Sequence, residues 1–97
     1  MQLAKVLGQV VSTVKEPGLS RFTLLVVQDA SGPDPERASG PAYVAVDVVG
    51  AGVGEIVLVA SGGAARVAAG ADAPTDRAVV AIADTVIRAG TVSYRKA

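Results

Sequence analysis

The chain has 97 residues, of which 51% are hydrophobic, nine are basic, nine are acidic, and none is cysteine or histidine. This length predicts one small globular domain covering residues 1–97, with a core modest enough that self-association is a natural source of extra stability. The balanced, scattered charge argues against a nucleic-acid binder, and the missing residue types exclude disulfides, cysteine nucleophiles and histidine-dependent bases.

Two strands are predicted at the N-terminal end. Residues 2–15 alternate between small apolar and mixed positions, as in a strand that is covered on one side. After the turn residues 16–20, a second strand at 21–29 is apolar on both faces. No apolar run in the chain approaches the ~20 residues that a membrane-spanning helix needs, and the N-terminus makes a poor signal peptide, so we expect a cytoplasmic protein.

The middle of the chain predicts a loop and two more strands. Residues 30–41 contain three prolines and two glycines, which indicates an exposed, mobile loop. Strands are expected at 42–49 and 55–61. The glycines between them are Gly50, Gly52 and Gly54, and we interpret them as a tight turn between two paired strands, where only glycine tolerates the backbone angles.

The last third of the chain holds the one predicted helix. Residues 62–72 are rich in alanine and end near Gly70, a plausible C-cap. Two β-rich stretches follow at 77–90 and 91–96. Five or six short strands and one small helix predict a mainly β fold, namely a small OB-like β-barrel of five to six strands with one short α-helix.

Several large aliphatic residues fall on faces that would point out of a barrel of this size. They include Leu25, Val27, Val80 and Ile82, or their alternates along the same strands. Because exposed apolar patches are rare in soluble monomers, we infer that another subunit covers part of the outer surface.

The glycine-rich stretch also invites comparison with phosphate-binding loops. A dinucleotide fingerprint needs a third glycine that opens a helix, but Glu55 stands at that position and the residues after it read as a strand. No Gly-Lys-Ser/Thr follows, as a Walker-type loop would require. We therefore expect no nucleotide cofactor.

Four acidic residues lie within or beside apolar strands: Asp47, Glu55, Asp76 and Asp84. Carboxylates in such places can be catalytic when paired, but they are more often satisfied by an arginine or by backbone donors. Arg66 and Arg77 are the obvious partners. With no histidine, no cysteine and no second acid at a recognisable spacing, we predict neither a catalytic nor a metal site.

Two binding alternatives stay open at this point. Ser61-Gly62-Gly63 at the start of the helix offers backbone amides to an anion, although simple N-capping by Ser61 is the favoured interpretation. A barrel that binds single-stranded nucleic acid needs a basic groove with stacking aromatics, and only Phe22, Tyr43 and Tyr94 are available. A small OB-fold ligand- or nucleic-acid-binding module is thus the weaker reading.

Five segments, taken in this order and at these spacings, resemble the EutN/CcmL family of bacterial microcompartment vertex proteins: VSTVK at 11–15, LLVV at 24–27, VAVDVVGAGVGE at 44–55, SGGAAR at 61–66 and PTDRAVVAIAD at 74–84. The resemblance implies an OB-like barrel that forms a homopentamer and caps the five-fold vertices of an icosahedral shell, in a carboxysome or a metabolosome. It implies hexameric and pseudohexameric shell proteins as partners, and a structural role without enzymatic activity, cofactor, nucleic acid or membrane.

The resemblance also carries four residues over as candidates for subunit-interface or structural ion pairs. They are Glu55, at the acidic end of the glycine turn; Arg66, which closes the helix motif; and Asp76 and Asp84, which flank the next strand. We expect Arg66 to pair with one of these carboxylates, within or between subunits, and to fix the helix against the barrel. The family often has serine where SGGAAR has its second glycine.

A second set of residues matches the family's Ser-Thr-x-basic motif. We place Ser12, Thr13 and Lys15 of this motif near the five-fold axis, as pore candidates. A rival hypothesis of another class makes the protein a minor enzyme or a metabolite-gating subunit that acts at the central opening of the pentamer.

Overall fold

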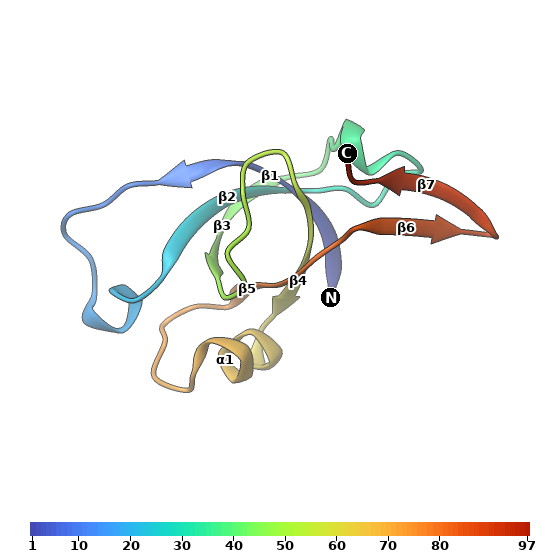
Figure 1. The fold of residues 1–97 in the computed structure, drawn as a ribbon. Coiled ribbons are helices and arrows are strands. Elements are labelled where there is room, and N and C mark those ends of the chain that lie inside the picture. Colours follow the sequence, from blue (N-terminus) through green and yellow to red (C-terminus); the bar gives the residue numbers. More distant parts are fainter.

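The computed structural model describes residues 1–97 and is mainly β, with seven strands, one α-helix and two short 3-10 turns (Figure 1). A closed barrel consists of β1 (Gln2–Val10), β2 (Thr23–Asp29), β3 (Ala42–Asp47), β4 (Ile56–Ser61) and β5 (Arg77–Ile82), while β6 (Thr85–Arg88) and β7 (Thr91–Arg95) form a separate two-stranded sheet. The helix α1 spans Gly63–Ala69, and the 3-10 turns η1 and η2 span Pro17–Leu19 and Pro35–Arg37. The predicted small barrel with one short helix is confirmed.

The barrel order explains where the strand predictions differ from the structure. The strands neighbour one another in the order β1-β2-β3-β5-β4, so β3 and β4 are not partners. The predicted pairing of the two strands on either side of the glycines is therefore wrong, because β5 inserts between them and pairs with β3 in parallel. The predicted strand 77–90 is two strands, since the chain leaves the barrel after Ile82 and starts the β6–β7 hairpin.

Small aliphatic side chains fill the barrel. The main buried cluster is formed by Ala4, Val6, Leu25, Val27, Ala45, Val57, Val59 and Val79. Leu25 and Val27 thus point inward, and it is their alternates, Leu24 and Val26, that face outward and are half-buried. Alternation along each strand produces this arrangement, since a five-stranded barrel is narrow and only every second residue fits inside.

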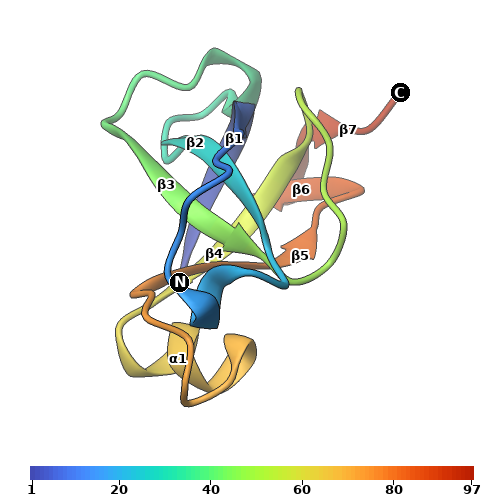
Figure 2. The same cartoon turned by 90° about the vertical axis from the view of Figure 1, so that its left-hand side faces the viewer.

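Helix α1 covers one end of the barrel (Figure 2). A second buried cluster lies beneath it, formed by Val46, Ala65, Ala69, Ala73 and Ala78. The helix is shorter than the predicted 62–72 and has Gly70 as its C-cap. Its N-cap is Gly62 with no side-chain hydrogen bond, so the predicted capping by Ser61 is wrong.

The β6–β7 hairpin gives the molecule its elongated shape. It projects from one side of the barrel, while η1 lies on the opposite side and α1 lies below the barrel, and the extents along the principal axes are 43 × 24 × 22 Å (Figure 1). Figure 2, viewed from the η1 end, places the hairpin behind the barrel. No helix has the length and apolarity to cross a membrane.

The predicted loop at 30–41 contains the turn η2. Most of its residues are exposed, yet Pro35 is buried. The Lys5 ammonium donates a hydrogen bond to the Glu36 carbonyl at 3.1 Å. This contact holds the loop against β1.

Candidate functional site

The loop between β3 and β4 is organised by the carboxylate of Asp47. This carboxylate accepts hydrogen bonds from the backbone amides of Val49, Gly50 and Ala51 at 3.1, 3.0 and 2.9 Å. Gly50 and Gly54 have positive φ angles of 83° and 89°, whereas Gly52 does not. Asp47 is thus satisfied by backbone donors, as expected of an acid beside an apolar strand.

Glu55 joins this loop to the C-terminal end of the chain. Its carboxylate accepts a hydrogen bond from the Gly52 amide and forms an ion pair with the Lys96 ammonium. The Lys96 hydrogen bond and, to a lesser degree, the Gly52 amide lower the pKa of Glu55. The same contact with Glu55 raises the pKa of Lys96. We call this pair the C-terminal clasp, because it ties the end of the hairpin to the barrel loop.

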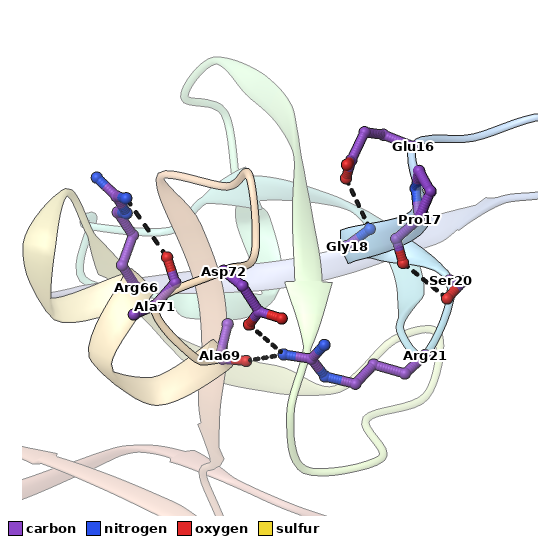
Figure 3. A network of polar contacts seen from close by, with 9 residues as sticks. All are labelled: Glu16, Pro17, Gly18, Ser20, Arg21, Arg66, Ala69, Ala71 and Asp72. Atoms are coloured by element: carbon purple, nitrogen blue, oxygen red, sulfur yellow. Dashed lines mark hydrogen bonds and ion pairs between the residues drawn. The ribbon is translucent and has the colours of Figure 1, made fainter.

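Arg66 has no carboxylate partner within the chain. Its guanidinium donates one long hydrogen bond, of 3.5 Å, to the Ala71 carbonyl just beyond α1 (Figure 3). Of the three acids proposed for it, Glu55 pairs with Lys96 and Asp76 pairs with Arg77 at 3.3 Å. The carboxylate of Asp84 has no ion pair. The structure therefore does not bring Arg66 together with any of them inside one subunit.

Arg21, which the sequence analysis did not single out, ties the end of α1 to the barrel instead. Figure 3 shows its guanidinium donating to the Ala69 carbonyl at 2.7 Å and to the Asp72 carboxylate at 3.3 Å. A cation beside the last carbonyls of a helix satisfies acceptors that have no partner in the helix itself. Arg21 lies 48 residues before Ala69, so no local sequence signal pointed to it.

The segment after β1 carries the pore candidates. Ser12 and Thr13 are exposed, and the Ser12 hydroxyl donates to the Val14 carbonyl at 2.7 Å. Lys15 is half-buried, and its ammonium donates to the Phe22 carbonyl at 3.3 Å. The charge of Lys15 is thus held against its own barrel, while the two hydroxyl residues face outward.

Tyr43 on β3 forms a polar contact with Asp29 at the end of the neighbouring strand β2. Its hydroxyl donates to the Asp29 carboxylate at 2.8 Å, and the Arg77 guanidinium lies 5.3 Å from the centre of its ring. Burial, and next the hydrogen bond to Asp29, raise the pKa of Tyr43 to about 12. The phenol is therefore neutral and acts as a donor across the physiological range.

The structure gives little support to the alternative of a ligand- or nucleic-acid-binding module. Phe22 and Tyr43 each have an arginine of the same chain over the ring, and Tyr94 is buried. No group of three or more acidic side chains is close enough to hold a metal ion. None of the three aromatic residues is a fully open surface on which a base could stack.

Known proteins are similar in sequence to this one over almost the whole chain. Residues 1–84 match the family model described as "Ethanolamine utilisation protein EutN/carboxysome". The carboxysome shell vertex protein CcmL of Synechocystis sp. is 54% identical over 99% of this chain and 95% of its own length. The bacterial microcompartment shell vertex protein EutN of Salmonella typhimurium is 44% identical over 99% of this chain and 96% of its own length.

Solved structures share the fold as well. A structure of a carboxysome subunit, CcmL, is 49% identical and superposes with a TM-score of 0.89, covering 100% of both chains. A structure described as the pentameric microcompartment shell protein GrpN of Rhodospirillum rubrum is 46% identical, with a TM-score of 0.78, and the match covers 91% of this chain and 99% of that one.

Proposed function

We propose a structural role in a protein shell, from the premise that the chain belongs to the EutN/CcmL family. The protein forms a homopentamer and occupies the five-fold vertices of a bacterial microcompartment. It is a shell component, as the names of its relatives state for them, and we propose no enzymatic activity for it.

One observation carries this proposal: the likeness to the pentameric shell protein GrpN extends over 91% of the chain in fold and sequence together. The surface of the chain is consistent with it. Large hydrophobic residues are exposed on several elements, including Leu7, Val44, Val48, Ile87 and Val92. In a pentamer, such residues are available for burial against neighbouring subunits.

Arg66 is proposed as an interface residue. Its guanidinium is exposed and has only one long hydrogen bond in its own chain, to Ala71. The Asp84 carboxylate has no ion pair either. An arginine of one subunit and a carboxylate of the next, Asp84 or Asp76, would form a charge-assisted contact between subunits.

Ser12 and Thr13 are proposed to face the five-fold axis. Both are exposed and precede a lysine whose ammonium is bound to its own barrel. In this arrangement hydroxyl groups, and not the charge of Lys15, line the opening.

Hexameric and pseudohexameric shell proteins are the proposed neighbours of the pentamer, and the whole of residues 1–97 acts as one unit. The family model ends at residue 84, so the β6–β7 hairpin lies beyond it. The curated relatives nevertheless match over 99% of the chain, hairpin included.

Native mass spectrometry tests the assembly. A mass of five subunits is the expected result, and a monomer with salt-dependent affinity for oligonucleotides would instead favour the binding module. For Arg66, the variant Arg66→Ala should weaken the pentamer and lower its thermal stability. Pentamers of unchanged thermal stability would refute the role of Arg66 without touching the shell function.

A further inference from the structure

All five strands of the barrel present a polar residue at the same end. Along each strand the inward-facing positions are aliphatic in the core, and the last position of this series is polar. The strand register brings these positions together, since Ala4 lies opposite Asp29 and Ser61 lies opposite Arg77. The five polar residues, which we call the polar end of the barrel, are Gln2, Asp29, Tyr43, Ser61 and Arg77.

A small cavity lies at the polar end. It has a volume of about 230 Å³, and it is lined by Met1, Gln2, Tyr43, Val59, Ser61 and Arg77. At ~30 Å³ for each water molecule, this volume equals about eight waters. Pockets for drug-sized ligands measure ~300–1,000 Å³, so this cavity suits a ligand of only a few heavy atoms.

The one acid of the polar end already has hydrogen-bond donors. The Asp29 carboxylate accepts from the Tyr43 hydroxyl at 2.8 Å. With the Gln2 amide oriented so that its nitrogen faces Asp29, that nitrogen lies 2.9 and 2.8 Å from the two carboxylate oxygens. Asp29 is not part of the cavity lining, and among the lining side chains Arg77 is the one that is charged at neutral pH.

Arg77 is held in place while part of its guanidinium stays free. The guanidinium lies 5.3 Å from the centre of the Tyr43 ring, a cation–π contact. Both hydrogen bonds of the guanidinium come from Nη1, to the carbonyl and the carboxylate of Asp76 at 3.1 and 3.3 Å. The Asp76 side chain is 79% exposed, so this ion pair is weak in water. Nε and Nη2, which form one edge of the planar group, remain for another acceptor.

The Ser61 hydroxyl is a second free donor beside this edge. Ser61 and Arg77 are direct cross-strand partners, and the Cβ atoms of such pairs lie ~4.5–5.5 Å apart. Ser61 is exposed, and its hydroxyl is not among those that donate within the chain. A guanidinium edge with a neighbouring hydroxyl matches a planar carboxylate, whose two oxygens can accept from the edge in parallel.

We propose that the polar end of the barrel binds a small carboxylate ligand. The two oxygens of the ligand accept from Nε and Nη2 of Arg77, and one of them also accepts from the Ser61 hydroxyl. Tyr43 is a positioning residue, because its hydrogen bond to Asp29 fixes the ring on which Arg77 rests. This site adds a binding function to the proposed shell role and does not depend on the number of subunits.

A titration with acetate tests the site. NMR spectra of the isotope-labelled protein, in the assembly state that it adopts in solution, should show saturable shifts of the Ser61 amide and of the Arg77 Nε–H group. Acetamide has nearly the same shape without the charge, so it should cause no saturable shift. Equal shifts with acetamide, or none with acetate, would overturn the proposal.

Variants assign the contact to Arg77. Arg77→Gln should weaken acetate binding by at least about tenfold, because it removes charge-assisted hydrogen bonds. Arg37→Gln is the matched control, since Arg37 also pairs with an aspartate of its own chain, Asp34, and lies outside the cavity. Equal affinity of Arg77→Gln and the parent for acetate would contradict the assignment, and so would an equal loss in Arg37→Gln. Ser61→Ala, at an exposed position, should give a smaller loss than Arg77→Gln.

Inorganic phosphate distinguishes a carboxylate site from a general anion site. The parent should bind acetate more tightly than phosphate, because the guanidinium edge and the planar carboxylate match. Arg77→Lys keeps the charge without the planar edge, so this preference should disappear. Tighter binding of phosphate than of acetate by the parent would reject the carboxylate assignment. None of these outcomes bears on the pentamer, which native mass spectrometry tests separately.

Discussion

The barrel and the β6–β7 hairpin are stabilised in different ways. The barrel encloses a cluster of eight buried residues from all five of its strands. In the hairpin only Tyr94 is buried, and polar contacts at its surface hold it, such as the 2.8 Å hydrogen bond from Arg88 to the Gly32 carbonyl and the C-terminal clasp. A two-stranded ribbon is marginal on its own in water. The barrel is thus held by its own apolar core, whereas the hairpin is held mainly by polar contacts at its surface.

The largest effect should come from the barrel core. Ile56 is fully buried, and Ile56→Ala should lower the free energy of unfolding by about 2–5 kcal/mol, through lost burial and the cavity left behind. Urea denaturation followed by circular dichroism measures this.

The same change on the hairpin is the control for that prediction. Ile87→Ala should alter the unfolding free energy by less than about 0.5 kcal/mol in samples dilute enough to be monomeric. In concentrated samples Ile87→Ala should lower the apparent free energy of unfolding, since association of subunits adds to that free energy. If Ile56→Ala and Ile87→Ala lower the free energy of unfolding equally at all concentrations, the barrel and the hairpin are not stabilised in different ways.

Substitutions in the loop between β3 and β4, which the C-terminal clasp joins to the hairpin, should have a smaller effect on stability. Gly54 has a φ of +89°, where an L side chain is strained, so Gly54→Ala should cost about 1–2 kcal/mol. Gly52 is the matched control two residues away: it has no positive φ, and a Cβ there would meet only Glu55 Oε1, at 3.4 Å. If Gly52→Ala destabilises as much as Gly54→Ala in urea denaturation, backbone strain is not the cause.

The next smaller effect on stability should come from removing the polar contact of Tyr43 in the barrel. Tyr43→Phe removes the hydrogen bond to Asp29 and should cost about 0.5–1.5 kcal/mol, since the pair is only partly buried. The pKa of Tyr43 is raised from 10.0 to about 12, so its contribution to stability is fully present below about pH 10 and is lost as the pH rises toward 12.

An absorbance titration of the phenolate checks this value. It is made in a Tyr94→Phe background, so that Tyr43 is the one tyrosine left of the two in the chain. Asp29→Asn removes the negative charge and should move the titration of Tyr43 toward 10.0, without reaching it because burial remains. A Tyr43 that titrates near 10.0 in the parent would contradict the assignment.

The same contrast explains which features the sequence could predict. Alternation of small aliphatic residues defines a strand that is buried on one side, so the barrel and its fold class follow from residues such as Ala4, Val6 and Val57. Strand order does not follow from it: nothing local indicates that β5 lies between β3 and β4. Long-range ion pairs are missed for the same reason, since Arg21 meets Asp72 from 51 residues away, whereas the expectation that Arg77 serves as a partner of these acids is confirmed by its ion pair with Asp76.

The prediction that Arg66 forms an ion pair shows that a local sequence pattern does not identify a distant partner. Arg66 stands in the last turn of α1, where a basic residue suits the helix end, but Arg21 already occupies the Ala69 carbonyl. The sequence shows that Ile87 and Val92 are apolar, but it does not show that they are exposed, because exposure depends on how the whole chain folds. The C-cap Gly70 was predictable from the local sequence, although the N-cap was not, and contacts between distant elements such as Arg21 and Ala69 left no local pattern.

The smallest effect should come from the C-terminal clasp, because both of its side chains are partly exposed and exposed ion pairs contribute little to stability. Lys96→Met should raise the pKa of Glu55 toward its ordinary 4.5, which a carboxyl carbon NMR titration measures, but not fully, because the Gly52 amide still donates to it. Arg95→Met, next to Lys96 and without an ion pair in the structure, should leave that pKa unchanged.

The direction of the two shifts fixes the pH range of the clasp. The pKa of Glu55 is lowered, so its contribution is present above pH 4.5 and is lost as the pH falls through the lower folded value. The pKa of Lys96 is raised, so its contribution is present below pH 10.5 and is lost as the pH rises through the higher folded value. The clasp is therefore intact at neutral pH, and Lys96→Met should speed amide hydrogen exchange in β6 and β7 while the barrel amides keep their protection. Faster exchange in both regions would mean that the hairpin and the barrel unfold as one unit, and that the contrast between them does not extend to their dynamics.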